Sequence, residues 1–246
     1  MHLSIITGAS RGLGRAVAQQ LLARGHHVLA LSRHAAELPV PPAARLTAWS
    51  VDLVDAAPVA ERLSRWLAEE DPGELQSATL INNAGVVSQL APLSVVQADD
   101  LVRALRVGLE APTLLTAAFL RATADWKLPR KVVLVSSGLG RRAMAGSASY
   151  CAAKAGLDHL ARAVALEEEA KPNGARIVSL APGVIDTDMQ VQLRTADAAL
   201  FQERDKFIGL HTAGHLDSPA TAAAKMLKYL DRPDFGAPPV GDVRDA

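Results

Sequence analysis

The sequence of 246 residues has one cysteine, few aromatic residues and no net charge. The single cysteine, Cys151, excludes an intramolecular disulfide and fits a reducing compartment. Basic and acidic residues both number 26, so no net field favours nucleic acid or a membrane surface. No apolar run approaches the roughly 20 residues of a membrane helix, and the first residues resemble a strand, not a signal peptide. We therefore expect a cytoplasmic protein without a nucleic-acid or membrane partner.

What the sequence does contain is a regular alternation of apolar strand-like runs and helical stretches. The runs are rich in Val, Ile and Leu, which is typical of parallel strands buried on both faces. The pattern predicts an α/β fold, a single Rossmann-type doubly wound domain over 1–246 with helices on both faces of the sheet. Strands are expected at 3–7, 27–32, 45–50, 78–83, 131–137 and 175–181, with an edge strand within 235–243; helices are expected at about 12–24, 56–70, 98–124, 148–170 and 217–230.

A glycine-rich segment, ITGASRGLG (6–14), joins the first strand to the first helix. Glycines here allow a tight turn and let a pyrophosphate approach the backbone at the helix N-terminus, although a purely structural turn is the alternative. The second strand ends at Arg33, where no acid is available for the ribose hydroxyls. Arg33, joined by Arg11, therefore favours NADP(H) over NAD(H).

Tyr150 and Lys154 lie four residues apart in YCAAK, and Ser136 and Ser137 end the run VVLVSS. Residues i and i+4 share one face of a helix, so the Lys154 ammonium can lie beside the Tyr150 phenol. A neighbouring cation favours the phenolate, and we expect it to lower the pKa of Tyr150 from about 10. The three residue types together are suited to general acid–base chemistry on a substrate oxygen.

These motifs resemble the short-chain dehydrogenase/reductase family over nearly the whole chain. TGASRGLG matches the cofactor loop, Asp52-Leu53 the acid after the third strand, and NNAG (82–85) the motif after the fourth. The resemblance implies a catalytic triad of Ser137, Tyr150 and Lys154, with Ser137 preferred because it precedes the tyrosine by thirteen residues. It implies cofactor contacts from Gly8, Ser10, Arg11, Gly12, Leu13, Gly14, Arg33, Asp52, Leu53, Asn83, Ala84, Gly85, Tyr150, Lys154, Pro182, Gly183, Ile185 and Thr187.

Within the family, APGVIDTDMQ (181–190) is similar to the branch of benzil and sepiapterin reductases. That similarity implies NADPH-dependent reduction of one ketone in a small hydrophobic 1,2-dicarbonyl, with Tyr150 as general acid. The alternatives are reduction of a pterin side chain and a weakly catalytic NADPH-binding protein. Substrate contacts are expected from Ser137, Leu139, Met144 and Met189, beneath a covering region at 186–216. The resemblance also implies a homodimer through 98–124 and 148–170, and no metal.

The sequence departs from the family pattern at three places. Gly108 stands where the family has an asparagine that braces a proton-relay water, so Gly108→Asn should speed turnover if the relay is impaired. Met144 and Gly146 replace bulky aromatic residues before Tyr150, which predicts a wider pocket. Asp242 could match the pterin-binding acid of sepiapterin reductases only if two residues are inserted near Pro238.

Overall fold

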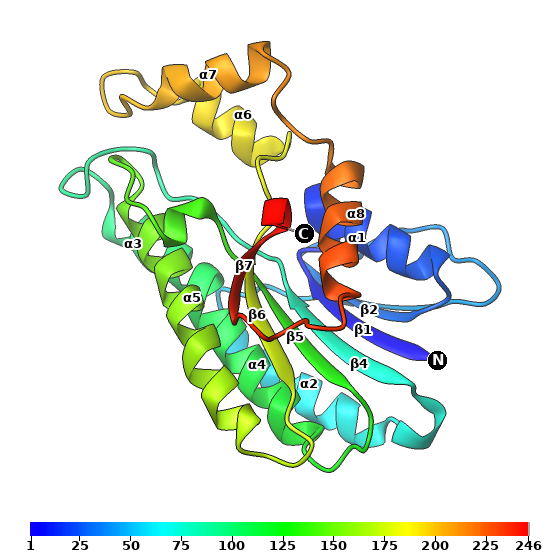
Figure 1. Cartoon of the computed structure of the whole chain (residues 1–246). Coiled ribbons are helices and arrows are strands. Elements are labelled where there is room, and N and C mark those ends of the chain that lie inside the picture. Colours follow the sequence, from blue (N-terminus) through cyan, green and yellow to red (C-terminus); the bar gives the residue numbers. More distant parts are fainter. Residues whose placement is uncertain (246) are drawn as a thin grey trace.

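The computed structural model describes residues 1–245, and its seven-stranded parallel sheet has the order β3-β2-β1-β4-β5-β6-β7 (Figure 1). All six residues of β2 are buried, as expected for a strand covered on both faces. The predicted fold class is confirmed, and the expected last edge strand is β7. The strands are β1 (His2–Thr7), β2 (His27–Ser32), β3 (Arg45–Ser50), β4 (Ser77–Asn82), β5 (Arg130–Val135), β6 (Arg176–Ala181) and β7 (Val240–Asp242).

Helices cover the two faces of the sheet and bury two separate apolar cores. The helices α1 (Gly12–Ala23) and α8 (Pro219–Leu230) pack on one face. The helices α2 (Ala56–Glu69), α4 (Ala111–Ala122) and α5 (Ala148–Glu169) pack on the other. None of the helices within residues 1–245 is long and apolar enough to cross a membrane.

The helix predicted at 98–124 is continuous from Ala98 to Ala122, but a π-helical turn at Arg106–Glu110 separates its α-helical parts, α3 (Ala98–Leu105) and α4. Gly108 lies in this turn and faces α5, where an added Cβ would come within 3.1 Å of the Ala153 Cβ. The missing side chain thus lets the turn approach the helix that carries Tyr150 and Lys154. Irregular turns of this kind are frequent near functional sites.

Two further helices, α6 (Asp188–Thr195) and α7 (Arg204–Thr212), stand above the carboxyl ends of the strands (Figure 1). They lie within the covering region expected at 186–216. A third apolar cluster beneath them joins Leu90, Met144, Leu193 and Phe201. Gly146 has φ +76°, and a Cβ there would lie 2.8 Å from the Phe201 ring. The ring of Phe201 therefore packs against Gly146 within this cluster and is fully buried.

Candidate active site

A cleft of about 720 Å³ opens at the carboxyl ends of the strands. The strand order reverses between β1 and β4, and ligands of doubly wound sheets bind at such a switch point. Every residue that the sequence predicts to bind cofactor or substrate, or to act in catalysis, lines this one cleft. The structure therefore brings the predicted set together, and the individual roles stay predictions.

The glycine loop at one end of the cleft has the geometry of a phosphate cradle. Gly8 and Gly12 adopt φ +71° and +53°, values that L side chains rarely tolerate. A Cβ on Gly14 would lie 2.2 Å from the Gly8 carbonyl oxygen, so only glycine fits where α1 begins. The Asn83 amide donates to the Thr7 carbonyl at 2.9 Å, which joins the loops that follow β1 and β4. These residues fit the pyrophosphate of a dinucleotide.

Two arginines line the same end of the cleft but differ in their partners. Arg33 is exposed and has no carboxylate partner within residues 1–245. Arg11 pairs with Asp188, the first residue of α6, at 2.6 Å. Residues 177 positions apart thus meet across the cleft mouth. Because Arg11 is paired with Asp188, Arg33 is the arginine of the two that remains free to bind a group near the expected ribose position.

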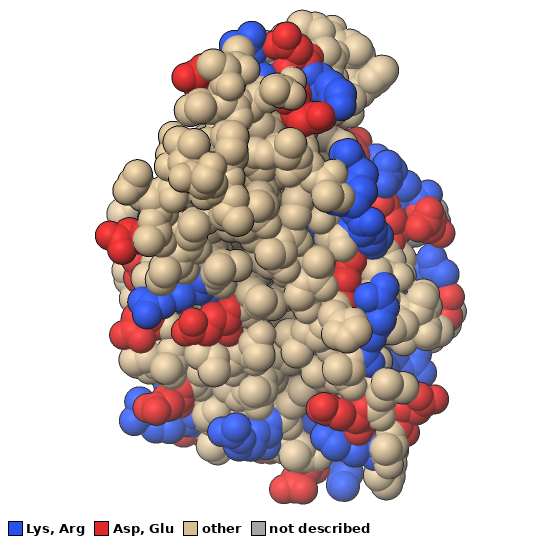
Figure 2. Space-filling model, turned by 90° about the vertical axis from the view of Figure 1, so that its left-hand side faces the viewer, with Lys and Arg blue, Asp and Glu red and all other residues tan. Residues whose placement is uncertain are grey.

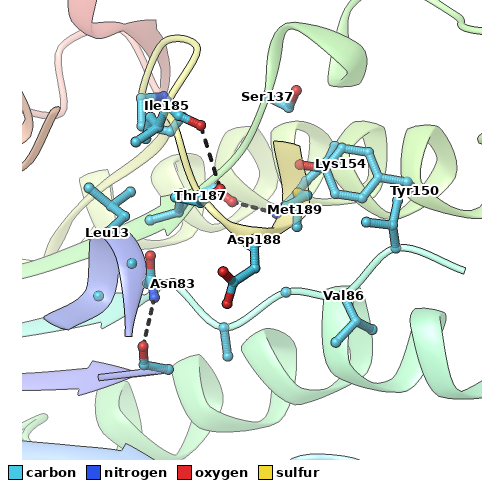
Figure 3. Close-up of a pocket in the computed structure, with 18 of the residues that line it drawn as sticks. Leu13, Asn83, Val86, Ser137, Tyr150, Lys154, Ile185, Thr187, Asp188 and Met189 are labelled. Carbon is cyan, nitrogen blue, oxygen red and sulfur yellow. Dashed lines mark hydrogen bonds between the residues drawn. The ribbon is translucent and has the colours of Figure 1, made fainter. Parts of the chain in front are cut away.

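Ser137, Tyr150 and Lys154 form the other side of the cleft, opposite Leu13 and Asn83 (Figure 3). Ser137 follows β5, while Tyr150 and Lys154 occupy successive turns of α5. The Lys154 ammonium lies 5.4 Å from the centre of the Tyr150 ring and donates to the Val135 carbonyl at 2.6 Å. The three side chains therefore converge on one region, as their spacing predicts.

The expected lowering of the Tyr150 pKa is wrong for this structure. Burial raises the pKa of Tyr150 to about 12, and hydrogen bonding by Ser137 only partly opposes this change. Burial also lowers the pKa of Lys154 to about 8, against the influence of Asp158. Removal of water disfavours the charged form of both groups, and this effect exceeds that of the neighbouring charge. Tyr150 is consequently protonated at neutral pH.

Some residues that line the cleft were not predicted from the sequence. Val86, Val87, Asp188, Gln190, Phe207 and Arg244 also line the cleft. Asp188 belongs to the segment APGVIDTDMQ, which could have indicated it, since its neighbours Thr187 and Met189 were predicted. Val86 directly follows NNAG and could have been found in the same way. Phe207 and Arg244 carry no local signal, because only the fold brings them to the cleft.

Comparison with known proteins agrees with this geometry. The model of the short chain dehydrogenase family matches residues 3–198. A benzil reductase ((S)-benzoin forming) from Bacillus cereus is 34% identical over 247 residues, which cover 99% of this chain and 98% of that protein. Sepiapterin reductase from Meriones unguiculatus is 33% identical over 245 residues, covering 94% of this chain and 92% of the relative. The crystal structure of the KRED1-Pglu enzyme has a TM-score of 0.80 at 25% identity and covers 96% of this chain and 98% of its own.

The fold and the cleft define a nucleotide-dependent oxidoreductase of the Rossmann type. The chain belongs to the short-chain dehydrogenase family, which confirms the resemblance found in the sequence. It is an oxidoreductase that acts on the CH–OH/C=O group, and its reductase relatives support a carbonyl reductase with a small-molecule substrate. The cofactor class of the family is NAD(P)(H).

Proposed function

We propose that this chain is an NADPH-dependent carbonyl reductase acting on a ketone of a small hydrophobic 1,2-dicarbonyl. One observation carries the proposal: Ser137, Tyr150 and Lys154 line the same cleft as the glycine loop and the unpaired Arg33. The apolar wall formed by Leu139 and Met189 suits a hydrophobic substrate. The similarity to benzil reductases supports this substrate class.

The chemistry follows from the groups on the cleft wall. A reduced nicotinamide, held by the glycine loop and by Lys154, would supply the hydride that forms the new C–H bond. Tyr150 gives its phenolic proton to the carbonyl oxygen as the C=O π bond breaks, and solvent later restores that proton. Ser137 donates a hydrogen bond to the same oxygen, which holds the carbonyl in place. The Lys154 ammonium stabilises the phenolate that Tyr150 becomes.

The preference for NADPH rests on Arg33. A guanidinium at this position can bind a 2′-phosphate in a bidentate manner, and no acid at the end of β2 competes for the ribose. Arg33→Asp should reverse the preference by weakening NADPH binding more than NADH binding. An unchanged ratio of the two kcat/KM values would remove Arg33 from the cofactor site.

A second candidate is the reduction of a pterin side chain, as in the sepiapterin reductases. Asp242 favours it, because this carboxylate lines the cleft. However, the Arg244 guanidinium already binds Asp242 at 2.8 and 2.6 Å, so the carboxylate is neutralised before a pterin arrives. Asp242→Ala should therefore leave diketone reduction intact. Loss of pterin affinity alone in this variant would favour the pterin reading.

The test is NADPH oxidation at 340 nm with benzil, 1-phenyl-1,2-propanedione and sepiapterin offered in parallel. Tyr150→Phe should abolish turnover while NADPH still binds. Tyr229→Phe is the matched control, because Tyr229 is the only other tyrosine and lies buried in α8. Equal turnover by the two variants would remove Tyr150 as the acid. NADPH binding without turnover of any carbonyl would favour the weakly catalytic binding protein.

A homodimer is proposed to form through the helices on one side of the molecule. Figure 2 shows a broad area without charged residues on the side where α3 and α5 lie. Several large apolar residues on these helices are exposed, among them Val102, Leu105 and Leu166, the last of which is 70% exposed. Burial of such side chains drives association. Light scattering should report a dimer, and Leu166→Arg should yield monomers; a variant that still dimerises would exclude this helix face.

A further inference from the structure

A buried carboxylate, Asp158, lies on α5 one turn beyond Lys154 and two turns beyond Tyr150. Only 2% of this residue is exposed. Its Oδ1 accepts hydrogen bonds from the hydroxyls of Ser136 and Ser179, each at 2.7 Å. Ser136 directly follows β5, and Ser179 lies in the carboxyl-terminal half of β6. Burial of a carboxylate is costly unless donors and a nearby cation compensate for the lost water, so this arrangement calls for an explanation.

The loop that carries Ser137 is fastened to the same carboxylate. The Arg141 Nε lies 3.3 Å from the Asp158 Oδ2, an atom without a hydrogen-bond partner in the described part of the chain. A Cβ on Gly140 would come within 2.9 Å of both the Asp158 Oδ2 and the Lys154 carbonyl oxygen. The loop of residues 136–141 therefore packs directly against α5, and its first and last residues, Ser136 and Arg141, both contact the Asp158 carboxylate.

Asp158 also lies on the same face of α5 as Lys154, one helical turn away. Lys154 is 5% exposed, and its ammonium donates to the Val135 carbonyl. Desolvation lowers the pKa of Lys154 and the Asp158 carboxylate opposes this change, because an anion favours the charged ammonium. We expect Arg141 to act in the opposite direction, since its cation lies 3.3 Å from Asp158 and partly neutralises the carboxylate.

Further charged groups lie behind Arg141. Its guanidinium donates to the Gly241 carbonyl at 2.8 Å and lies 3.9 Å from Asp242, which binds Arg244. Arg141, Asp242 and Arg244 therefore form a chain of alternating charge that leads from Asp158 to the cleft. Besides Lys154, Tyr150 is the other titratable group on α5 that takes part in the proposed reaction.

We propose that Asp158 is a positioning residue of the active site. It holds the Ser136–Arg141 loop, and with it Ser137, against the helix of Tyr150 and Lys154. It is also the buried counter-charge of Lys154, which lies one turn away on the same face of α5. The proposal rests on the proposed reductase function, but the ionisation of Lys154 can be measured without any substrate.

The first experiment is a pH titration of the Lys154 side chain by carbon-13 NMR of lysine ε-carbons, with its signal assigned from a Lys154→Met variant. Asp158→Asn keeps the shape of the side chain and removes the charge. We expect the pKa of Lys154 to fall by about one pH unit in this variant. Arg141→Gln should move the same pKa upward. Because Arg141 is partly exposed, this second variant tests the counter-charge even if Asp158→Asn does not fold.

Glu168 provides the matched control. It lies on the same helix, is 3% exposed, and binds Lys171 and the Ala175 amide. Glu168→Gln should lower stability as Asp158→Asn does, because both remove a buried charge from an ionic contact. It should leave the Lys154 titration where it is. A Lys154 pKa that is the same in wild type, Asp158→Asn and Arg141→Gln would overturn the counter-charge role.

A second experiment separates position from charge. The double variant Ser136→Ala with Ser179→Ala removes both hydrogen bonds and retains the carboxylate. We expect kcat to fall about tenfold with a smaller change in KM, because a displaced Ser137 weakens the transition state more than binding. An unaltered kcat would overturn the positioning role. If no carbonyl is turned over but Asp158→Asn still shifts Lys154, the reductase function fails while the counter-charge stands.

Discussion

Acidification from pH 7.5 to 5.0 should lower the free energy of unfolding by about 2 kcal/mol through His27 alone. This histidine in β2 is 2% exposed, hydrogen-bonds Thr47 at 3.0 Å and meets the edge of the Trp66 ring. Burial, assisted by Arg45, lowers the pKa of His27 from 6.5 to about 4. The unfolded chain therefore binds a proton before the folded chain does, and stability falls as the pH drops from about 6.5 toward 4.

The size of the effect follows from the two pKa values. With a pKa of 6.5 in the unfolded chain and about 4 in the folded chain, His27 shifts the equilibrium at pH 5.0 about 30-fold toward the unfolded chain, which corresponds to about 2 kcal/mol. His26 also has its pKa lowered to about 4 and acts in the same direction, with a smaller effect because it is partly exposed. Glu70, which lies 4.0 Å from His27, has a raised pKa and acts in the opposite direction.

The assay is urea unfolding at pH 7.5 and 5.0, at one protein concentration, for wild type and His27→Gln. Glutamine can still hydrogen-bond Thr47 but does not titrate. His26 and Glu70 are present in both proteins, so the difference between their pH dependences isolates His27. The variant should lose about 2 kcal/mol less than wild type on acidification. Equal losses in the two proteins would refute the assignment of a buried neutral histidine.

Three other outcomes follow from the cleft and its surroundings. Gly108→Asn should lower the melting temperature by a few degrees without speeding turnover, because the new side chain crowds Ala153. A second change, Ala153→Gly, made in the Gly108→Asn protein should restore the melting temperature. Faster turnover at an unchanged melting temperature would contradict this packing argument. Asp188→Ala should lower the KM for NADPH a few-fold at low salt by releasing Arg11, and an unchanged KM would show that the ion pair does not compete with the cofactor. The rate of reduction should decline as the pH rises through about 8, where Lys154 loses its charge, and a profile that stays flat to pH 10 would exclude that dependence.

Much of the fold could be predicted because the strands carry a strong local signal. The runs at 27–32 and 45–50 match β2 and β3 at both ends, although only β2 is buried throughout and β3 is largely exposed at the edge of the sheet. The glycine loop was equally predictable, because the need for glycine at Gly8 and Gly14 is local and steric. The set of cleft residues followed from motifs that end successive parallel strands.

What the sequence did not reveal depends on burial and on distant contacts. The spacing of Tyr150 and Lys154 indicates a shared helix face but not its depth, so the direction of the Tyr150 pKa change was wrong. The π-helical turn at Arg106–Glu110, in which Gly108 lies against α5, leaves no trace in the helical periodicity of the sequence. The pairing of Arg11 with Asp188 joins segments that are unrelated in sequence.

The separate apolar cluster beneath α6 and α7 has a consequence for motion. Its buried members, Leu90, Met144, Leu193 and Phe201, belong to neither of the two cores that flank the sheet. Opening of this region therefore exposes only a small part of the buried apolar surface, while the sheet stays intact. Local opening of this kind is more frequent than global unfolding, since its free energy scales with the few contacts that it breaks. The end of the cleft beneath α6 and α7 can thus exchange its contents while the glycine loop keeps its shape.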